Sequence, residues 1–564
     1  MLKIELQAIE DLRNAILAAI RCGMESGALP QAEIPEFTIE IPADRTHGDR
    51  AANVAMVSAK AFRMPPRKIA QVIADKIDLS KTYFERCEIA GPGFLNFFLA
   101  RRFYGDIIKE ILEQGSEFGR SDWGKKRKVM VEYVSANPTG PMHMGNARGG
   151  ALGDCLAAVL DAAGFDVTRE FYVNDAGNQI LKFGHSLGAR YLQLFKGEDA
   201  VEFPEDGYHG EDIIERAKEF AEVYGDKYVN TDAETREKAL VDFALPKNIE
   251  KMKADLEKYR IVYDNWFLES TLHNDGELQE TIEILKQRGM TYEKDGALWY
   301  RATANGAEKD EVLIRQNGTP TYFAADIAYH RNKFAKRGFD RVIDVWGADH
   351  HGHVARLKGA LDAIGLDGSK LDIVLIQLVR LVRGGEVVRM SKRTGKAIQL
   401  ADLLEEVPVD AARFYFNLRE ANSQMDFDLD LAVQQDSQNP VYYVQYAHAR
   451  ICSILKNLAA EGVHPRPCTD EELALLTAPE ETELIRHLAS CTEEIIASAR
   501  DYDPARMMRY VITLATLFHK FYTNCRVKGE EESLAAARLN LCLATATVLK
   551  NVLSMFKITA PESM

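Results

Sequence analysis

The segment at residues 129–150 constrains the fold of this chain more than any other. Residues 129–134 form a short apolar run rich in valine, which predicts a buried strand. A Pro/Gly loop follows with His143-Met144-Gly145-Asn146, and apolar residues then recur at helical spacing as far as Gly164. A loop that opens directly into a helix turns backbone N–H groups toward one point, which suits a phosphate. With a further strand predicted at 167–173, this is a β-loop-α-β unit, typical of a parallel nucleotide-binding sheet.

The 564 residues are too many for one ordinary domain and divide into three parts. Residues 1–120 mix short helical and strand patterns, which predicts a small α/β domain. Residues 121–435 hold the sheet unit. Residues 436–564 show only helical spacing, which predicts a bundle. The expected fold class is α/β, with a Rossmann-like parallel-sheet core that carries an insertion, a small N-terminal α/β domain and an all-α C-terminal bundle.

Several elements are predicted from periodicity alone. In the first part a helix is expected over 51–62. The core sheet is expected to resume after the insertion with strands at 341–346 and 371–381. The bundle helices are expected at 442–459, 481–499, 504–523 and 534–555.

The formal charge of −15 is unevenly distributed. Residues 196–242 contain 6 Lys or Arg and 15 Asp or Glu, so this segment accounts for −9 of the total. The rest of the chain can therefore still present a basic face to a phosphate backbone, although a solvated acidic insertion is the plain interpretation of the segment itself.

Nothing in the composition indicates a membrane protein or a secreted one. Apolar runs stay short of a membrane helix, and the N-terminus lacks a signal-peptide pattern. The eight cysteines contain no Cys-x-x-Cys pair, which argues against a zinc ribbon and for reduced thiols. We expect a cytoplasmic protein.

A second motif lies far downstream. Residues 389–395, with the sequence RMSKRTG, follow the strand predicted at 371–381. Alone, either motif would be an ordinary turn, but their joint occurrence after predicted strands indicates that ATP is activated. In such a reaction His143 and Asn146 would donate to phosphate oxygens, and Lys392 would neutralise the departing pyrophosphate. Gly145 would allow close approach of the backbone, and Met390 and Ser391 would belong to a loop closing over ATP.

This pair of motifs resembles the two signatures of class I aminoacyl-tRNA synthetases, and the wider sequence resembles the arginyl-tRNA synthetase family over nearly the whole chain. Asn146 departs from that pattern, which has a second histidine here, and Arg389 replaces its first lysine. The matching stretches are residues 132–140 (EYVSANPTG), 169–177 (REFYVNDAG), 321–330 (TYFAADIAYH), 347–353 (GADHHGH), 389–395 (RMSKRTG) and 439–450 (NPVYYVQYAHAR).

The resemblance implies an arginine–tRNA ligase. Such an enzyme makes arginyl-adenylate from L-arginine and ATP with Mg²⁺, and transfers arginine to the 3′-terminal adenosine of tRNA(Arg). It also implies a monomer. The residues that it assigns to ATP are His143, Gly145, Asn146, Met390, Ser391 and Lys392, and those that it assigns to arginine are Ser135, Asn137, Asn146, Tyr322, Asp326 and His350.

Tyr322 and Asp326 suit the guanidinium of arginine on physical grounds. A spacing of four places them on one helix face, and a carboxylate can accept a guanidinium bidentately. Without the other motifs, a buried tyrosine and a helix N-terminal acid would be the simpler interpretation. The cluster from Asp349 to His353 is not expected to hold a metal, because adjacent histidines rarely chelate one ion.

Tyr442, Tyr443, Tyr446 and Arg450 are predicted to contact unpaired bases of the tRNA, with packing inside the bundle as the alternative. Two rival functions remain open. One is the same chemistry with another amino acid, such as glutamine or cysteine. The other is a synthetase-like protein that binds tRNA or senses arginine without catalysis.

Overall fold

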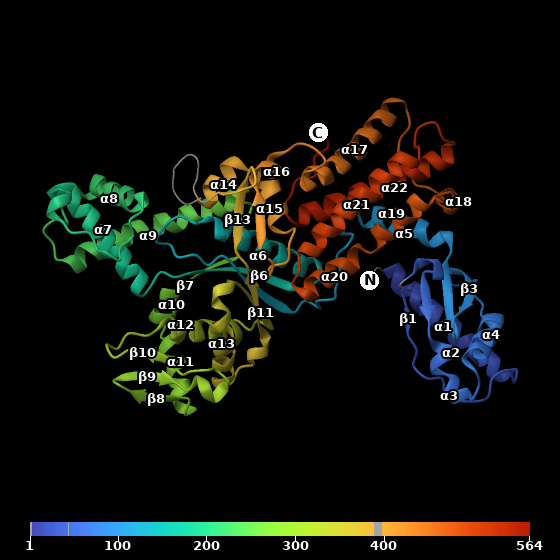
Figure 1. Ribbon diagram of the computed structural model, residues 1–564, viewed down its shortest axis with the longest axis horizontal. Coiled ribbons are helices and arrows are strands. Elements are labelled where there is room, and N and C mark those ends of the chain that lie inside the picture. Colours follow the sequence, from blue (N-terminus) through green and yellow to red (C-terminus); the bar gives the residue numbers. More distant parts are fainter. Residues whose placement is uncertain (1–2, 43, 389–397) are drawn as a thin grey trace.

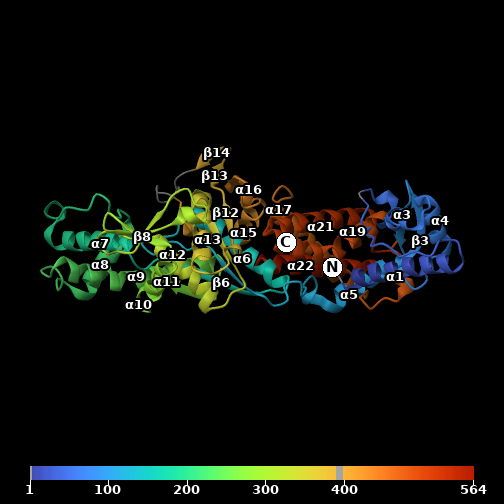
Figure 2. The same cartoon turned by 90° about the horizontal axis from the view of Figure 1, so that it is seen from below.

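The computed structural model describes residues 3–42, 44–388 and 398–564. The molecule is elongated (Figures 1 and 2). An α/β core lies between a helical projection at one end and the N-terminal domain at the other, and the C-terminal helices run between core and N-terminal domain. No helix in the described ranges is long and apolar enough to cross a membrane.

The core is built on a parallel sheet of five strands in the order β12-β11-β5-β6-β7. The chain therefore adds strands on one side of β5, and then returns to add β11 and β12 on the other side. The carboxyl ends of β5 and β11 flank the point where the winding reverses, which is where open α/β sheets bind ligands. The strands are β5 (Lys128–Glu132), β6 (Asp166–Val173), β7 (Asn265–Leu268), β11 (Arg341–Gly347) and β12 (Leu371–Ile376).

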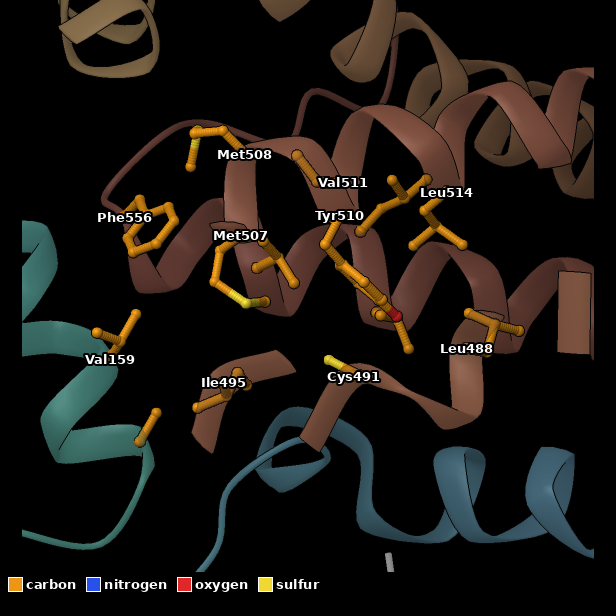
Figure 3. Packing of buried hydrophobic residues seen from close by; sticks show 14 of the residues in the cluster. Val159, Leu488, Cys491, Ile495, Met507, Met508, Tyr510, Val511, Leu514 and Phe556 are labelled. Atoms are coloured by element: carbon orange, nitrogen blue, oxygen red, sulfur yellow. The ribbon is translucent and has the colours of Figure 1, made fainter. Parts of the chain in front are cut away.

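Helix α6 (Met144–Ala162) covers one face of this sheet and is buried along most of its length. It packs very close to the strand that precedes it, because a Cβ atom on Gly153 would lie 2.2 Å from Cγ of Tyr133. The chain turns back after the helix at Gly164, whose φ of +93° favours glycine. On its outer side, Val159 faces apolar residues of the C-terminal helices, so that core and bundle share one hydrophobic cluster (Figure 3).

The other face of the sheet is covered by a second apolar cluster, built from helices and a small antiparallel sheet ordered β10-β9-β8. These elements are α10 (Glu269–Asn274), α11 (Glu277–Gln287), β8 (Thr291–Lys294), β9 (Ala297–Tyr300), β10 (Glu311–Ile314), α12 (Tyr322–Arg331), the π-helical turn η5 (Asn332–Lys336) and α13 (His351–Ala363).

The insertion consists of three helices, α7 (Asn178–Lys196), α8 (Glu211–Tyr224) and α9 (Ala233–Lys258). Their inner faces form a separate hydrophobic core that includes Phe183, Tyr191 and Phe220. The acidic segment at 196–242 supplies much of this unit. Its negative charge therefore belongs to a folded helical projection.

The strand predicted over 371–381 is wrong as a single element. It divides into β12 and β13 (Val379–Arg383), which belong to different sheets. Between them Gln377 leaves the central ladder, since its N–H donates to the carbonyl of Ala421 and its carbonyl accepts from Arg148. β13 pairs with β14 (Glu386–Val388) and β15 (Met425–Asp428). Helices α14 (Leu400–Glu406), α15 (Val409–Phe416) and α16 (Leu429–Val433) complete this region.

The C-terminal bundle contains one more helix break than its periodicity predicts. The helix expected over 481–499 divides at Ser490, whose hydroxyl donates to the carbonyl of His487 and so competes with the helical ladder. The helices are α17 (Pro440–Ala460), α18 (Asp470–Leu473), α19 (Pro479–Ala489), α20 (Cys491–Asp501), α21 (Ala505–Asn524) and α22 (Glu532–Met555).

The N-terminal domain is a sheet ordered β1-β2-β4-β3 with helices beside it. The helix expected over 51–62 is wrong at its start, because residues 50–52 pair with β4, and the remainder breaks at Ser58. The elements are α1 (Lys3–Glu25), β1 (Ile39–Glu40), β2 (Arg50–Ala52), α2 (Val54–Val57), α3 (Ala59–Phe62), α4 (Pro66–Lys76), β3 (Phe84–Ala90), β4 (Phe94–Leu99) and α5 (Arg101–Gln114). α5 packs against α18, α19 and α22 of the bundle.

Candidate active site

A cleft of about 570 Å³ opens at the carboxyl ends of β5 and β11, where the winding of the sheet reverses. Ser135, Tyr322, Asp326 and His350 line it, so the fold brings together four of the residues that the sequence assigns to arginine. They come from the loop after β5, from helix α12 and from the segment after β11. A separate cavity of about 150 Å³ adjoins the cleft across Tyr322.

The wall formed by Ser135 has an unusual backbone. Val134 and Ser135 follow β5 directly with φ values of +71° and +42°, a conformation that costs a β-branched residue in particular. The Ser135 hydroxyl donates to Oε1 of Glu132 at 2.9 Å and accepts from the N–H of Tyr172 at 3.2 Å. These two bonds fix the hydroxyl in the strained turn.

Tyr322 and Asp326 lie one helical turn apart on the cleft side of α12. Thr321 caps the helix through its side chain. Nε2 of His353 lies 2.9 Å from Oδ2 of Asp326 and fixes the orientation of this carboxylate. Burial raises the pKa of the Tyr322 phenol, so the ring stays neutral and keeps its O–H as a donor.

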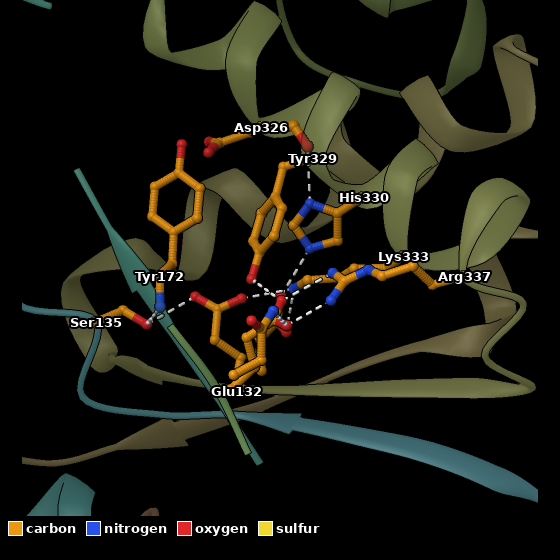
Figure 4. Close-up of polar contacts among 11 residues, drawn as sticks. Glu132, Ser135, Tyr172, Asp326, Tyr329, His330, Lys333 and Arg337 are labelled. Carbon is orange, nitrogen blue, oxygen red and sulfur yellow. Dashed lines mark hydrogen bonds and ion pairs between the residues drawn. The ribbon is translucent and has the colours of Figure 1, made fainter. Parts of the chain in front are cut away.

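A row of buried carboxylates forms the floor beneath the cleft (Figure 4). Glu132 of β5 is the register partner of Asp344 of β11 on one side and of Glu170 of β6 on the other. Glu170 is wholly buried and is held by Arg337, Tyr329 and Asn265. Its role is therefore structural.

His143 caps the N-terminus of α6. Its Nδ1 accepts from the N–H of Gly145 at 3.1 Å, which leaves Nε2 of the neutral ring to carry the proton as a donor. Asn146 completes a capping box, because its Oδ1 accepts from the N–H of His143 at 3.1 Å. A Cβ atom on Gly145 would lie 3.0 Å from the His143 ring, so glycine leaves room for this arrangement.

The cap of α6 is hydrogen-bonded to residues 398–400, which come just after the second motif in the chain. The N–H of Met144 donates to the carbonyl of Ile398 at 3.1 Å, and the N–H of Leu400 donates to the carbonyl of Met142 at 2.9 Å. The segment that follows the second motif therefore runs alongside the cap of α6. Met390, Ser391 and Lys392 themselves lie outside the described residues.

Asn137 and Asn146 do not line the cleft. The side-chain N–H of Asn137 donates to Gln179 of the insertion at 2.8 Å. Sequence reasoning missed Glu132, His353 and Glu269. Glu132 was visible only as the polar end of an apolar strand, and His353 as one of several adjacent histidines. Glu269 lines the adjoining cavity and carried no motif signal.

The aromatic residues predicted to contact tRNA are half-buried on α17. The rings of Tyr442 and Tyr446 are nearly parallel, with centroids 6.3 Å apart, and the Arg450 guanidinium lies over Tyr446. Tyr443 packs against His519 of α21. Tyr446 also contacts His519, so the three tyrosines and this histidine form one partly exposed aromatic face.

Among the described residues, no group of three or more His, Cys, Asp or Glu side chains is arranged to hold a metal ion.

The chain matches three protein families along its length. They are the arginyl tRNA synthetase N-terminal domain at residues 7–99, the catalytic domain of class I (R) tRNA synthetases at 107–452 and the DALR anticodon-binding domain at 444–564. Among curated relatives, the arginine–tRNA ligase of Acetivibrio thermocellus is 58% identical over 561 residues, which covers 100% of this chain and 99% of the relative. The arginine–tRNA ligase of Caldanaerobacter subterraneus is also 58% identical, and its alignment covers 99% of both chains.

Solved structures agree with these matches. A putative arginyl-tRNA synthetase from Campylobacter jejuni superposes with a TM-score of 0.74 at 33% identity, over 83% of this chain and 100% of the other. The arginyl-tRNA synthetase of Thermus thermophilus has a TM-score of 0.70 at 24% identity and covers 98% of this chain and 100% of its own, which shows a common fold.

Proposed function

The chain belongs to the arginyl-tRNA synthetase family, and from that premise we propose how it acts as an arginine–tRNA ligase. It would join L-arginine to ATP as arginyl-adenylate with release of pyrophosphate, and then transfer arginine to the 3′-terminal adenosine of tRNA(Arg). The observation that carries the proposal is the cleft at the reversal of the sheet, which Tyr322 and Asp326 line together with Ser135.

Arginine would enter this cleft with its guanidinium toward α12. The Asp326 carboxylate can accept two parallel N–H bonds from a guanidinium, and His353 holds that carboxylate in place. Ser135, Asn137, Asn146 and His350 would serve the remainder of the amino acid. Two of these, Ser135 and His350, line the cleft.

ATP would bind at the N-terminus of α6. Nε2–H of His143 and the side-chain Nδ2 of Asn146 are donors near a helix end that favours negative charge. Ile398 is anchored to Met144 by its carbonyl, and Lys392 precedes Ile398 by six residues. Even a fully extended chain therefore keeps Lys392 within about 20 Å of Ile398. With Met390 and Ser391 it would contact the phosphates, and Mg²⁺ would arrive with ATP as part of the substrate.

No protein nucleophile is required. The carboxylate of arginine attacks the α-phosphate and displaces pyrophosphate, and a ribose hydroxyl of tRNA later attacks the carbonyl carbon of the adenylate and displaces AMP. Catalysis would rest on positioning and on stabilisation of charge at the phosphate.

The bundle would hold tRNA(Arg) through its aromatic face, with Tyr442, Tyr443, Tyr446 and Arg450 in contact with unpaired bases. We further propose that tRNA must bind before arginine is activated. A cytoplasmic location and a monomeric state stay predictions.

The test is ATP–pyrophosphate exchange with each of the twenty amino acids, with and without bulk tRNA. Exchange with arginine alone, and only with tRNA present, is the expected result. Exchange with a different amino acid would overturn the roles of Tyr322 and Asp326. Exchange at full rate without tRNA would overturn the dependence on tRNA, and no exchange at all from folded protein would favour a non-catalytic tRNA-binding protein.

A further inference from the structure

Three buried acids stand side by side across the central sheet. Glu170, Glu132 and Asp344 occupy partnered positions on β6, β5 and β11, and each is less than a tenth exposed. In a parallel ladder, partnered residues point to the same side of the sheet. Such neighbouring carboxylates repel strongly away from water unless cations separate them.

The basic side chains that pair with this row all come from one short stretch of chain. His330 lies in the last turn of α12, Lys333 lies in the π-helical turn η5, and Arg337 follows that turn (Figure 4). Arg337 pairs with Glu170. His330 has Nε2 at 2.7 Å from Asp344 and Nδ1 at 2.8 Å from the carbonyl of Asp326. This stretch therefore docks α12 onto the carboxylate row.

Lys333 is the member that joins two strands. Its side chain is fully buried, and Nζ lies 2.5 Å from Oε2 of Glu132 and 3.0 Å from Oδ1 of Asp344. Burial opposes the charged form, but the two carboxylates outweigh it and raise the pKa of Lys333 above its ordinary value. Burial likewise opposes ionisation of Asp344, yet Lys333 and His330 hold its pKa below the usual range.

Both walls of the cleft depend on these contacts. Glu132 uses Oε2 for Lys333 and Oε1 for the hydroxyl of Ser135, so the lysine fixes the carboxylate that in turn fixes the strained turn. Lys333 also lies two residues beyond the end of α12, the helix that carries Tyr322 and Asp326. A π-helical turn is rare and occurs often at functional sites, and here it places the lysine between two strands.

We infer that Lys333 is a positioning residue for the amino acid substrate, acting through Glu132 and α12 to set both walls of the arginine cleft. This rests on the proposed function of that cleft. Lys333 touches neither ATP nor the α6 cap in this role, so its loss should affect arginine and spare ATP.

The test is steady-state ATP–pyrophosphate exchange, with tRNA present, for the full-length protein and for Lys333→Met. The variant should raise the KM for arginine about tenfold or more, the loss expected for a charge-assisted contact, and leave the KM for ATP within about twofold. Lys336→Met is the matched control. Lys336 lies in the same turn but is 41% exposed and pairs with Glu277, outside the cleft, so neither KM should change.

An unchanged KM for arginine in Lys333→Met would overturn the inference, as would an equal rise in both KM values. Loss of charge balance is tested separately with Asp344→Asn, alone and combined with Lys333→Met. Lys333→Met should still raise the KM for arginine when it is added to Asp344→Asn, because it removes the bond from Lys333 to Glu132 that the single variant keeps. If the KM for arginine does not rise further in the double variant, Lys333 acts only as a counterion for Asp344 and does not position Glu132. A wild-type protein without arginine-dependent exchange would refute the proposed function itself.

Discussion

Met144 and Ile398 are joined by a backbone hydrogen bond of 3.1 Å, although 254 positions separate them in the chain. The bond connects the cap of α6 to the segment that leaves the second motif. The residues that follow the second motif therefore lie against the first motif, at the end of the sheet where nucleotides bind in such folds.

The first prediction concerns His143, which both caps α6 and presents Nε2–H. His143→Ala should slow arginine activation by about 10²–10³-fold, equivalent to ~2.7–4 kcal/mol, as for the loss of one transition-state donor. It should also destabilise the protein by about 0.5–2 kcal/mol through the lost cap. His143→Asn restores a good cap, but its shorter amide places the N–H donor short of the position of Nε2, so it should recover stability and stay slow. Exchange assays and urea unfolding measure the two effects, and a fully active Asn variant would remove Nε2 from the mechanism.

The second prediction concerns Asp326. Asp326→Asn removes the negative charge opposite a guanidinium, and the KM for arginine should rise about ten- to 150-fold, equivalent to roughly 1.5–3 kcal/mol of lost binding free energy. Asp349→Asn is the control, because Asp349 lines the same cleft with a side chain that is 82% exposed. Equal effects from both variants would mean that overall charge in the cleft matters and that Asp326 makes no specific contact.

The sequence predicted those parts of the site that depend on residues close together in the chain. The strand, loop and helix around His143 follow from periodicity and capping, and helical spacing placed Tyr322 and Asp326 on one face. These features depend on residues within one or two turns of each other. They could be predicted without knowledge of the rest of the fold.

Other features depend on distant residues and were beyond such reasoning. The strand expected over 371–381 breaks because Arg148, 229 positions away, takes the carbonyl of Gln377. The carboxylate row exists only because Glu132 and Asp344 fall into register in the sheet. Neither event leaves a periodic signal in the sequence.

The third prediction follows from Arg148, which is 1% exposed and has no carboxylate partner among the described residues. It donates to the backbone carbonyls of Gln377, Glu420 and Ser423 at 2.7–2.9 Å, and burial lowers its pKa to about 10, so it stays charged near neutrality. It thereby ties α6 to the start of β13, the strand whose hairpin leads into the second motif.

Arg148→Met should destabilise the protein by about 1–3 kcal/mol for each carbonyl left buried without a donor, and it should raise the KM for ATP. Arg148→Lys keeps the charge but loses the planar set of guanidinium N–H donors. Its stability and its KM for ATP should therefore lie between those of wild type and of Arg148→Met. Urea unfolding and the KM for ATP provide the measurements. A loss of stability without any change in the KM for ATP would show that this contact does not place the second motif.

The fourth prediction concerns Asp154, where α6 meets the C-terminal end of the chain. Its buried carboxylate pairs with Arg413 and with Lys557, which follows α22. Burial opposes ionisation, but the two cations outweigh it and hold the pKa of Asp154 below its ordinary value of 3.8. For an acid whose pKa is lowered by folding, the stabilisation is complete above the unfolded pKa and is lost as the pH falls through the folded one.

Asp154→Asn should therefore lower the free energy of unfolding by about 3–5 kcal/mol at pH 7, since it leaves Arg413 buried without its carboxylate. The difference from wild type should stay constant down to about pH 5 and shrink below about pH 4. Asp161→Asn, on the same helix but 46% exposed and paired with Arg120, should change stability by less than about 1 kcal/mol. Unfolding measured from pH 7 to pH 3 checks both variants. A difference that persists unchanged in acid would mean that Asp154 contributes through packing and not through its charge.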